Sequence, residues 1–398
     1  MFISFLLSLV SYPTSLYIWN SMQDLRQFFA PIHFLETGEL NMYDAHQPDA
    51  FTLSASIKNA DWEEADIVIV GCGESRGADE NAAYSHAPDA VRKQFYQMYS
   101  WHPKVKVADM GNILEGATIG DTRAALRTVL QEIAAAGKVA VVLGGSHDLT
   151  LQQYEAFKKQ NKVINATVAD MLIDLNEEEL ISNRSFLMDM LTGEPNFVKH
   201  YSHVGFQSYY VHPKMLETLD KLRFDFFRLG KVREHIEDIE PVLRASDLMS
   251  IDMNIVRFSD APANTDGSPN GLNGEEICTL ARYAGMSSRL TSWGIYGFDQ
   301  EKDQHQMTAK LIAQMLWYFI DGYLIRKNES KLSDKEEFNE FHVTFTGNDI
   351  SFLKSKRTNR WWMQLPQGDY VPCSYHDYIM ASSNEIPERW LREQERLV

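Results

Sequence analysis

The sequence predicts an α/β protein built on a mostly parallel β-sheet. Apolar runs of strand length alternate with helix-length segments from about residue 65 to about residue 325. This alternation is typical of βαβ units, whose strands lie parallel in one sheet. The chain has 398 residues, of which 44% are hydrophobic. That is enough for one large α/β domain with extensions, or for two domains.

The elements follow from local patterns along the chain. Residues 66–73 contain an apolar run at 67–70 followed by a glycine turn, which predicts a buried strand. Residues 88–99 form a predicted helix with proline in its first turn. Residues 121–133 form a capped amphipathic helix that leads into a strand at 139–143. Residues 308–325 form a long apolar helix, which we expect to be the last element of the core.

Composition divides the chain into four parts. Residues 1–21 contain a nine-residue apolar run, too short to span a bilayer, and no Lys or Arg. This pattern favours a misassigned start over an apolar leader for export or anchoring. Residues 22–64 are an N-terminal extension, and 65–326 are the α/β domain. Residues 327–398 begin as a charged linker and continue as a small strand-and-helix extension.

Charge and cysteine content restrict the possible partners and compartment. The formal net charge is −17, which argues against nucleic acid or an anionic membrane as a partner. The three cysteines, Cys72, Cys278 and Cys373, are far apart in the sequence. They form neither a zinc pattern nor a disulfide framework, which is typical of a reducing compartment. We therefore expect a cytoplasmic protein.

Polar side chains follow three of the predicted strands. His147 comes after the strand at 139–143 and a Gly-Gly turn. Asp170 and Asp174 come at the end of a second apolar run, and Asp252 ends a third. In an open α/β sheet, ligands bind outside the carboxyl ends of the strands. One imidazole and three carboxylates meeting there would suit a hard divalent cation such as Mn²⁺.

Simpler interpretations of these residues stay open. A histidine after a Gly-Gly turn can be hydrogen-bonded beneath a loop, and aspartates at strand ends can act as caps or turn formers. His203 lies in a strand-like segment and is expected to be structural. Trp361 and Trp362 are expected to pack against the core or a neighbouring subunit, in preference to forming a cation-binding cage.

Several motifs in order resemble the ureohydrolase superfamily, which includes arginase, agmatinase and formimidoylglutamase. The matching segments are Ala87-Pro-x-x-Val91-Arg92, Gly144-Gly-Ser-His147, Asp170-x-x-x-Asp174, Ser250-Ile-Asp252-x-Asn254, and Asp303 with Thr308-Ala309. The extensions and the segment at 270–276 are most similar to a formimidoylglutamase-like branch. The resemblance implies a three-layer arginase-type α/β fold, with N- and C-terminal extensions added to it. It also implies two Mn²⁺ ions bridged by a hydroxide that attacks an amidine or guanidinium carbon.

Carried over residue by residue, the resemblance implies one intact metal site. His147, Asp170, Asp174 and Asp252 match the ligands of the more buried metal. Among them, Asp170 and Asp252 match the bridging pair, which would position the metal hydroxide in catalysis.

The ligands of the second metal are degenerate. The central histidine of the aspartate motif is replaced by Leu172, and the second aspartate of the late motif by Asn254. Leucine cannot ligate a metal, and an amide oxygen is a weaker donor than a carboxylate. The glutamate that meets the substrate in the family falls at Gly297. Asn176 is a candidate for contacting substrate. We therefore expect one Mn²⁺ ion, not two.

Two functions from different classes are consistent with this pattern. The first is metal-dependent hydrolysis of a C–N bond in a small amidine- or guanidine-type molecule, with a single remaining metal site. The second is a non-catalytic ureohydrolase-fold protein that binds a small ligand or a protein partner. The resemblance also implies a homo-oligomer.

Overall fold

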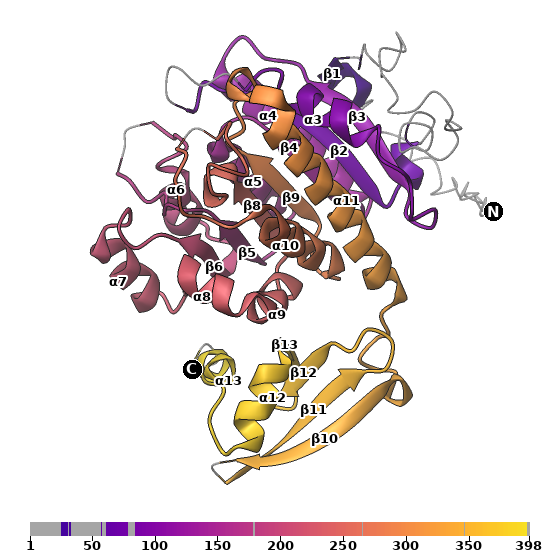
Figure 1. Ribbon diagram of the computed structural model, residues 1–398, viewed down its shortest axis with the longest axis vertical. Helices are drawn as coiled ribbons and strands as arrows, with labels where there is room; N and C mark the ends of the chain where they lie inside the picture. The colour runs from indigo at the N-terminus through magenta and orange to yellow at the C-terminus, as the bar shows by residue number, and fades with distance from the viewer. Residues whose placement is uncertain are drawn as a thin grey trace, which may run out of the picture.

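The computed structural model describes residues 25–30, 32, 57, 61–78, 84–177, 180–264, 266–345 and 347–395 (Figure 1). The expectation for residues 1–21 lies outside these residues. None of the helices in the described part of the chain has the length and hydrophobicity needed to cross a bilayer.

A nine-stranded sheet forms the centre of the main domain, in the order β1-β3-β2-β4-β9-β8-β5-β6-β7. All neighbouring strands pair in parallel except β1 with β3. The strands are β1 Phe29–Ala30, β2 Ile67–Cys72, β3 Val107–Ile113, β4 Val139–Gly144, β5 Ile164–Ala169, β6 Val198–Phe206, β7 Asp225–Arg228, β8 Leu248–Asp252 and β9 Ser292–Tyr296.

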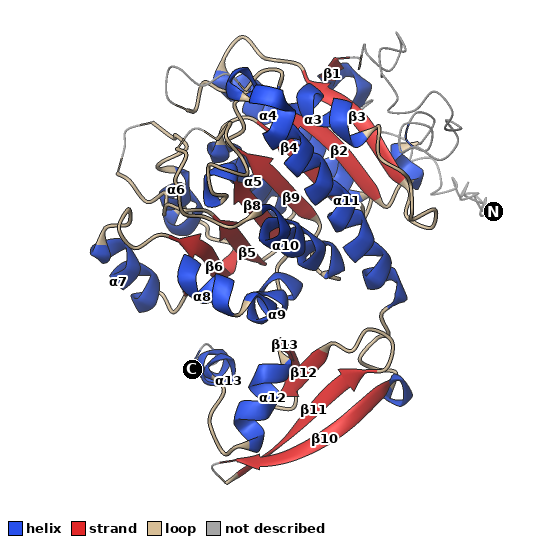
Figure 2. Cartoon of the chain, in the orientation of Figure 1, coloured by secondary structure: helices blue, strands red, loops and turns tan. Residues whose placement is uncertain are grey.

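Helices cover both faces of this sheet (Figure 2). The helices are α3 Ala87–Phe95, α4 Ile119–Ala135, α5 Thr150–Lys159, α6 Phe186–Thr192, α7 Pro213–Lys221, α8 Leu229–Glu234, α9 Glu240–Arg244, α10 Gly274–Met286 and α11 Met307–Asn328. Helices α3, α8, α9, α10 and α11 share one hydrophobic cluster with the sheet, and α4 to α7 form the clusters of the other face. Strands β2, β4, β8 and β9 are buried along their whole length, as strands between two helical layers must be. The predicted three-layer α/β fold is confirmed.

Helix boundaries differ from the sequence prediction for local reasons. Helix α4 begins at Ile119, two residues before the predicted start, because Thr118 is its N-cap. The Thr118 hydroxyl accepts from the Asp121 amide, and the Asp121 carboxylate accepts from the Thr118 amide. Asp121 therefore completes a capping box inside the helix and does not begin it. Helix α3 ends at Phe95, earlier than predicted.

The strand order determines where a ligand site can lie. Strands β4, β9, β8 and β5 are consecutive neighbours in the sheet. Neighbouring strands lie about 4.8 Å apart, so the loops after these strands leave the same short stretch of sheet edge. His147 follows β4, Asp170 follows β5, and Asp252 ends β8.

The C-terminal residues form a second, smaller unit. A four-stranded antiparallel sheet runs in the order β10-β11-β12-β13. Its elements are β10 Phe338–Phe345, β11 Asn348–Ser355, β12 Trp361–Gln364, β13 Tyr370–Cys373, α12 Tyr375–Ser382 and α13 Glu388–Glu395. The buried Arg244 of α9 joins it to the main domain, donating to the carbonyls of Trp361 at 2.9 Å and Cys373 at 3.1 Å. Its guanidinium also lies 4.4 Å from the centre of the Trp362 ring.

Candidate metal centre

The loop after β4 holds His147 over the carboxyl edge of the sheet. Its Gly145 has no room for a side chain, because a Cβ there would lie 2.1 Å from the Glu74 carbonyl oxygen. The same carbonyl accepts a hydrogen bond from the Ser146 amide at 2.9 Å. Because the loop is pressed against the segment after β2, His147 enters a buried position at the start of a short 3-10 helix.

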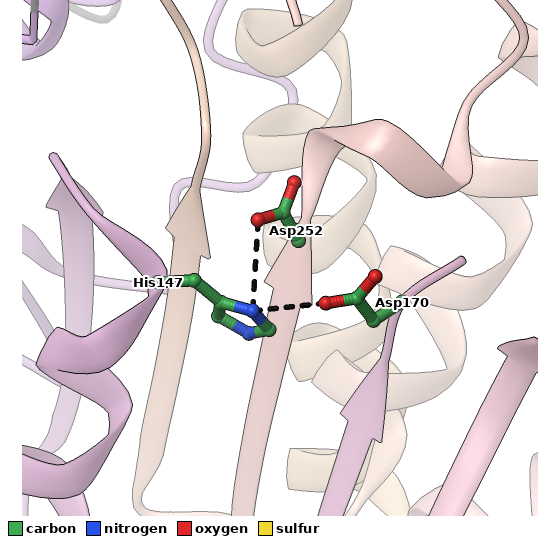
Figure 3. Close-up of side chains that lie close together, drawn as sticks. All are labelled: His147, Asp170 and Asp252. Carbon is green, nitrogen blue, oxygen red and sulfur yellow. Dashed lines mark ion pairs between the residues drawn. The ribbon is translucent and has the colours of Figure 1, made fainter. Parts of the chain in front are cut away.

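Three carboxylates surround one nitrogen of this imidazole. His147 Nδ1 lies 3.0 Å from Asp170 Oδ2, 3.2 Å from Asp174 Oδ2 and 3.5 Å from Asp252 Oδ2. Figure 3 shows His147, Asp170 and Asp252 pointing toward one another from three separate segments. All four side chains are buried. The residues predicted from the sequence therefore meet in space.

The other imidazole nitrogen is held by a hydroxyl pair. His147 Nε2 lies 2.9 Å from Ser250 Oγ, which in turn lies 2.6 Å from Thr150 Oγ1. With Nε2 engaged, Nδ1 is the nitrogen that faces the carboxylates. This arrangement fixes the ring orientation in the way that supporting residues orient a metal-ligating histidine.

The contacts around Nδ1 fit a shared cation better than hydrogen bonding. Despite their short separation, neither His147 Nδ1 nor Asp170 Oδ2 has a hydrogen-bond partner in suitable geometry among the described residues. Among the described residues, His147, Asp170 and Asp252 offer ligand atoms that all lie within 4.8 Å of one another. Asp174 contacts the same imidazole nitrogen. Imidazole and carboxylate donors at this spacing suit Mn²⁺.

Electrostatics also favour a cation. Burial, together with the charge of Asp170, raises the pKa of Asp174 well above its ordinary value and that of Asp252 to about 7. Burial would raise the pKa of Asp170 too, but the contact with His147 outweighs it and lowers that pKa. Burial would lower the pKa of His147, yet the carboxylates outweigh it and raise that pKa well above its ordinary value. A divalent ion would relieve this accumulation of buried negative charge.

Sequence comparison places the chain in a known family. A model described as the Arginase family matches residues 65–321. This chain belongs to the arginase family. The ureohydrolase resemblance predicted from the motifs is therefore confirmed.

Individual relatives of this arginase-family chain are formimidoylglutamases. The chain is 23% identical over 271 residues to that of Staphylococcus carnosus (strain TM300), covering 65% of this chain and 87% of the relative. A structure of Trypanosoma cruzi formiminoglutamase with Mn2+2 superposes with a TM-score of 0.64 at 17% identity, covering 69% of this chain and 99% of that one. The formimidoylglutamase of Bacillus subtilis gives a TM-score of 0.63 at 17% identity, covering 73% and 98%. At these identities the superpositions establish the arginase fold.

The two degenerate metal-ligand positions take part in backbone hydrogen bonds. The Leu172 amide donates to Asp170 Oδ1 at 2.7 Å, and the Leu172 side chain is half-buried. Asn254 is buried, and its Oδ1 accepts from the Met171 amide at 3.1 Å. The Asn254 oxygen therefore stabilises the loop after β5. Asn176 is exposed, and its amide donates to the Arg184 carbonyl at 3.0 Å.

At Gly297, the position of the family's glutamate, the structure leaves no space for a side chain. Its φ of +76° is in the left-handed region, and a Cβ there would lie 2.4 Å from Asp252 Oδ1. Only glycine meets both conditions without strain. Any side chain at this position would displace a predicted metal ligand.

Replacing Gly297 with alanine should therefore weaken Mn²⁺ binding. The left-handed backbone costs a non-glycine residue about 1–2 kcal/mol, and the added methyl must also push Asp252 aside. Gly137→Ala is the matched control, because Gly137 has a φ of +70° but no atom of the described residues within 4 Å of its Cβ position. Thermal melts should show a loss of stability in both variants. Mn²⁺ titration should show weaker binding only in Gly297→Ala, and equal binding by both variants would contradict this.

Sequence reasoning missed several residues around the imidazole. The rings of Phe186 and Tyr296 lie 4.8 and 5.7 Å from the His147 ring, measured between centroids. Ser250 belongs to the Ser250-Ile-Asp252-x-Asn254 motif, but the motif alone assigns it no role. Its position two residues before Asp252 on one strand, and so on the same face, was the available signal. His203 is buried, with Nε2 3.1 Å from the Asp170 carbonyl oxygen, which agrees with its expected structural role.

Proposed function

We propose that this arginase-family protein is a hydrolase that uses one Mn²⁺ ion to cleave a C–N bond of a linear amidine or guanidine. The observation that carries the proposal is the buried Nδ1 of His147, which faces three carboxylates without a suitably oriented hydrogen bond. The similarity to formimidoylglutamases supports the reaction class. The T. cruzi relative, solved with Mn2+2, supports the choice of metal.

Each group in the site has a definable part in such a reaction. His147, Asp170, Asp174 and Asp252 would hold the ion. When bound, a divalent ion supplies Lewis acidity and lowers the pKa of water. The carboxylates of Asp170 and Asp252 also give the site a negative potential, which attracts a cationic amidine.

Other residues keep the site rigid and dry. Ser250 and Thr150 fix the imidazole orientation through their hydroxyls. Phe186 and Tyr296 cover the imidazole with apolar surface, which limits access of bulk water. Positioning by such groups accounts for a large part of catalysis, because small displacements of the reacting atoms are costly in rate.

A second candidate function is a non-catalytic ligand-binding protein, and Gly297 favours it. A carboxylate that orients a cationic amidine is missing there, and the backbone leaves no room for one beside Asp252. The amide oxygen of Asn254 is likewise engaged with Met171. Under this alternative, the site would retain a small ligand without turnover.

Bound Mn²⁺ per chain tests the proposal. The purified protein is loaded with Mn²⁺, desalted and measured by elemental analysis; we expect about one ion in the wild type and none in His147→Ala. His86→Ala is the control, because His86 is exposed and its side chain makes no cap hydrogen bond. Two tightly bound ions would refute the single site, and no ion in the wild type would refute metal-dependent hydrolysis.

An amidine screen then separates the two candidate functions. Formimidoylglutamate, agmatine and arginine are each incubated with the Mn²⁺-loaded protein. The release of formamide from the first compound, or of urea from the other two, is measured. Turnover that His147→Ala abolishes supports the hydrolase. Saturable binding of one of these compounds without turnover supports the non-catalytic alternative.

A further inference from the structure

A cavity of about 520 Å³ lies between the main domain and the C-terminal unit. Figure 1 shows the C-terminal unit next to α9. Side chains from both parts line the cavity, among them Glu237, Glu240, Tyr283, Trp361, Tyr375 and His376.

The cavity is remote from the candidate metal centre. Glu240 begins α9, which ends at Arg244 shortly before the first residue of β8. Asp252 is the last residue of the same strand. A five-residue strand is roughly 17 Å long, so the cavity and the metal centre lie at opposite ends of the sheet.

The polar feature of the cavity is an unsatisfied carboxylate oxygen. Glu240 is only 9% exposed. Its Oε2 accepts from Arg244 at 3.0 Å, while its Oε1 has no hydrogen-bond partner in the described part of the chain. An ion-pair contact of 3.8 Å joins Oε1 to Arg360 Nη1, and this nitrogen already donates to the Met286 carbonyl at 2.8 Å. Leaving a buried carboxylate oxygen unpaired is costly, so a cationic donor in the cavity would be favoured.

Nearby groups add negative charge and aromatic surface. Glu237 is a second carboxylate on the lining, with a side chain that is 63% exposed. Tyr283 shares this lining with both carboxylates, and burial together with the charges of Glu240 and Glu237 raises the pKa of its hydroxyl. On the opposite wall, the ring centroids of Trp361 and Tyr375 lie 5.5 Å apart. Carboxylates combined with aromatic faces recognise organic cations.

The cations already present do not neutralise this lining. Arg244 is paired with Glu240 at 3.0 Å, and Arg360 with Glu329 at 2.8 Å, so each arginine offsets one carboxylate. His376 lies 3.4 Å from Asp238, a further carboxylate of the same segment. In the described part of the chain, the ion-pair contacts of Glu237 and Asp238 are with histidines only, at 3.7 and 3.4 Å. With these histidines neutral, the excess charge around the cavity is negative.

We propose that this cavity binds a small organic cation, a primary ammonium or guanidinium group on a short apolar chain. The cationic group would donate to Glu240 Oε1 and be attracted by Glu237, while the chain packs against Trp361 and Tyr375. Such a ligand would contact both the main domain and the C-terminal unit. This inference does not depend on the proposed hydrolase activity.

Calorimetric titration of the full chain tests the charge requirement. n-Butylammonium and n-butylguanidinium are the probes, and n-butanol and n-butylurea are their uncharged counterparts. We expect saturable binding of the cations with a Kd of about 1 mM or tighter, and binding of the uncharged compounds at least about tenfold weaker. The proposal would be overturned if the cations show no saturable binding, or if the uncharged compounds bind equally well.

Variants locate the binding to this cavity. Glu237→Gln and Tyr375→Ala change exposed side chains and should each weaken cation binding about fivefold. Glu385→Gln, an exposed control outside the lining, should leave it unchanged. Glu240→Gln should abolish cation binding. If this variant does not fold, because Arg244 loses its partner, Glu237→Gln and Tyr375→Ala test the location of the binding site.

Cation binding in this cavity must also be distinguished from cation binding at the metal centre. His147→Ala, measured without Mn²⁺, should bind the cations as the wild type does. Loss of cation binding in His147→Ala, with retention in Glu237→Gln and Tyr375→Ala, would place the ligand at the metal centre and overturn the inference.

Discussion

Replacing Arg92 with methionine should lower the free energy of unfolding by about 3–5 kcal/mol, the cost of breaking a buried ion pair on one side. Arg92 of α3 is fully buried and forms a two-pronged contact with Asp109, with bonds of 2.8 and 2.9 Å. Tyr96 donates a third hydrogen bond to the same carboxylate at 2.5 Å. Methionine fills a similar volume but leaves the Asp109 charge buried without a counter-ion.

A double variant tests whether the stranded charge is the cause. Arg92→Met combined with Asp109→Leu removes both charges, so we expect a smaller loss than in Arg92→Met alone. Arg233→Met is the surface control, because the Arg233 side chain, which pairs with Glu276, is 45% exposed. This variant should leave the free energy of unfolding nearly unchanged. Urea denaturation followed by circular dichroism provides the measurement. Equal losses in the single and double variants would show that packing, not charge, dominates at this position.

The sequence predicts the central strands well because their pattern is local. Strands β2, β4 and β8 are mostly apolar and end in Cys72, Gly144 and Asp252, and burial on both faces favours such apolar runs. Strand β7, Asp225–Arg228, is short, lies at the sheet edge and is only partly buried. It therefore gives no continuous apolar run. Strand β1 has two residues and is defined only by its pairing with β3, which lies far along the chain.

The site, too, has features that the local sequence pattern predicts and features that depend on packing between distant segments. Placing the aspartates at strand ends predicts that they meet, because parallel strands share one carboxyl edge. The order β4-β9-β8-β5, which decides how closely they meet, depends on pairings distant in sequence. The left-handed conformation of Gly297 and its contact with Asp252 depend on the same packing. Glu240 and Arg244 have the residue types of a solvated helix surface, but both are buried, and Arg244 donates to the Trp361 carbonyl of the C-terminal unit.

Introducing Leu172→His together with Asn254→Asp should raise bound Mn²⁺ from about one to about two ions per chain. The backbone around both positions is already fixed, because the Leu172 amide donates to Asp170 and Asn254 Oδ1 accepts from the Met171 amide. Aspartate has the same shape as asparagine, so it can keep this hydrogen bond and offer its second oxygen to a metal. Elemental analysis after Mn²⁺ loading gives the ion count.

The single variants serve as controls for this expectation. Asn254→Asp alone supplies one new donor, and Leu172→Ala with Asn254→Asp opens space without adding the imidazole, so neither should gain a full second ion. Restored metal binding need not restore fast turnover, because Gly297 still provides no carboxylate to orient a cationic amidine. A double variant that still holds one ion would mean that the residues surrounding these positions no longer support a second site. The amidine screen would then have to separate the single-ion hydrolase from the non-catalytic function.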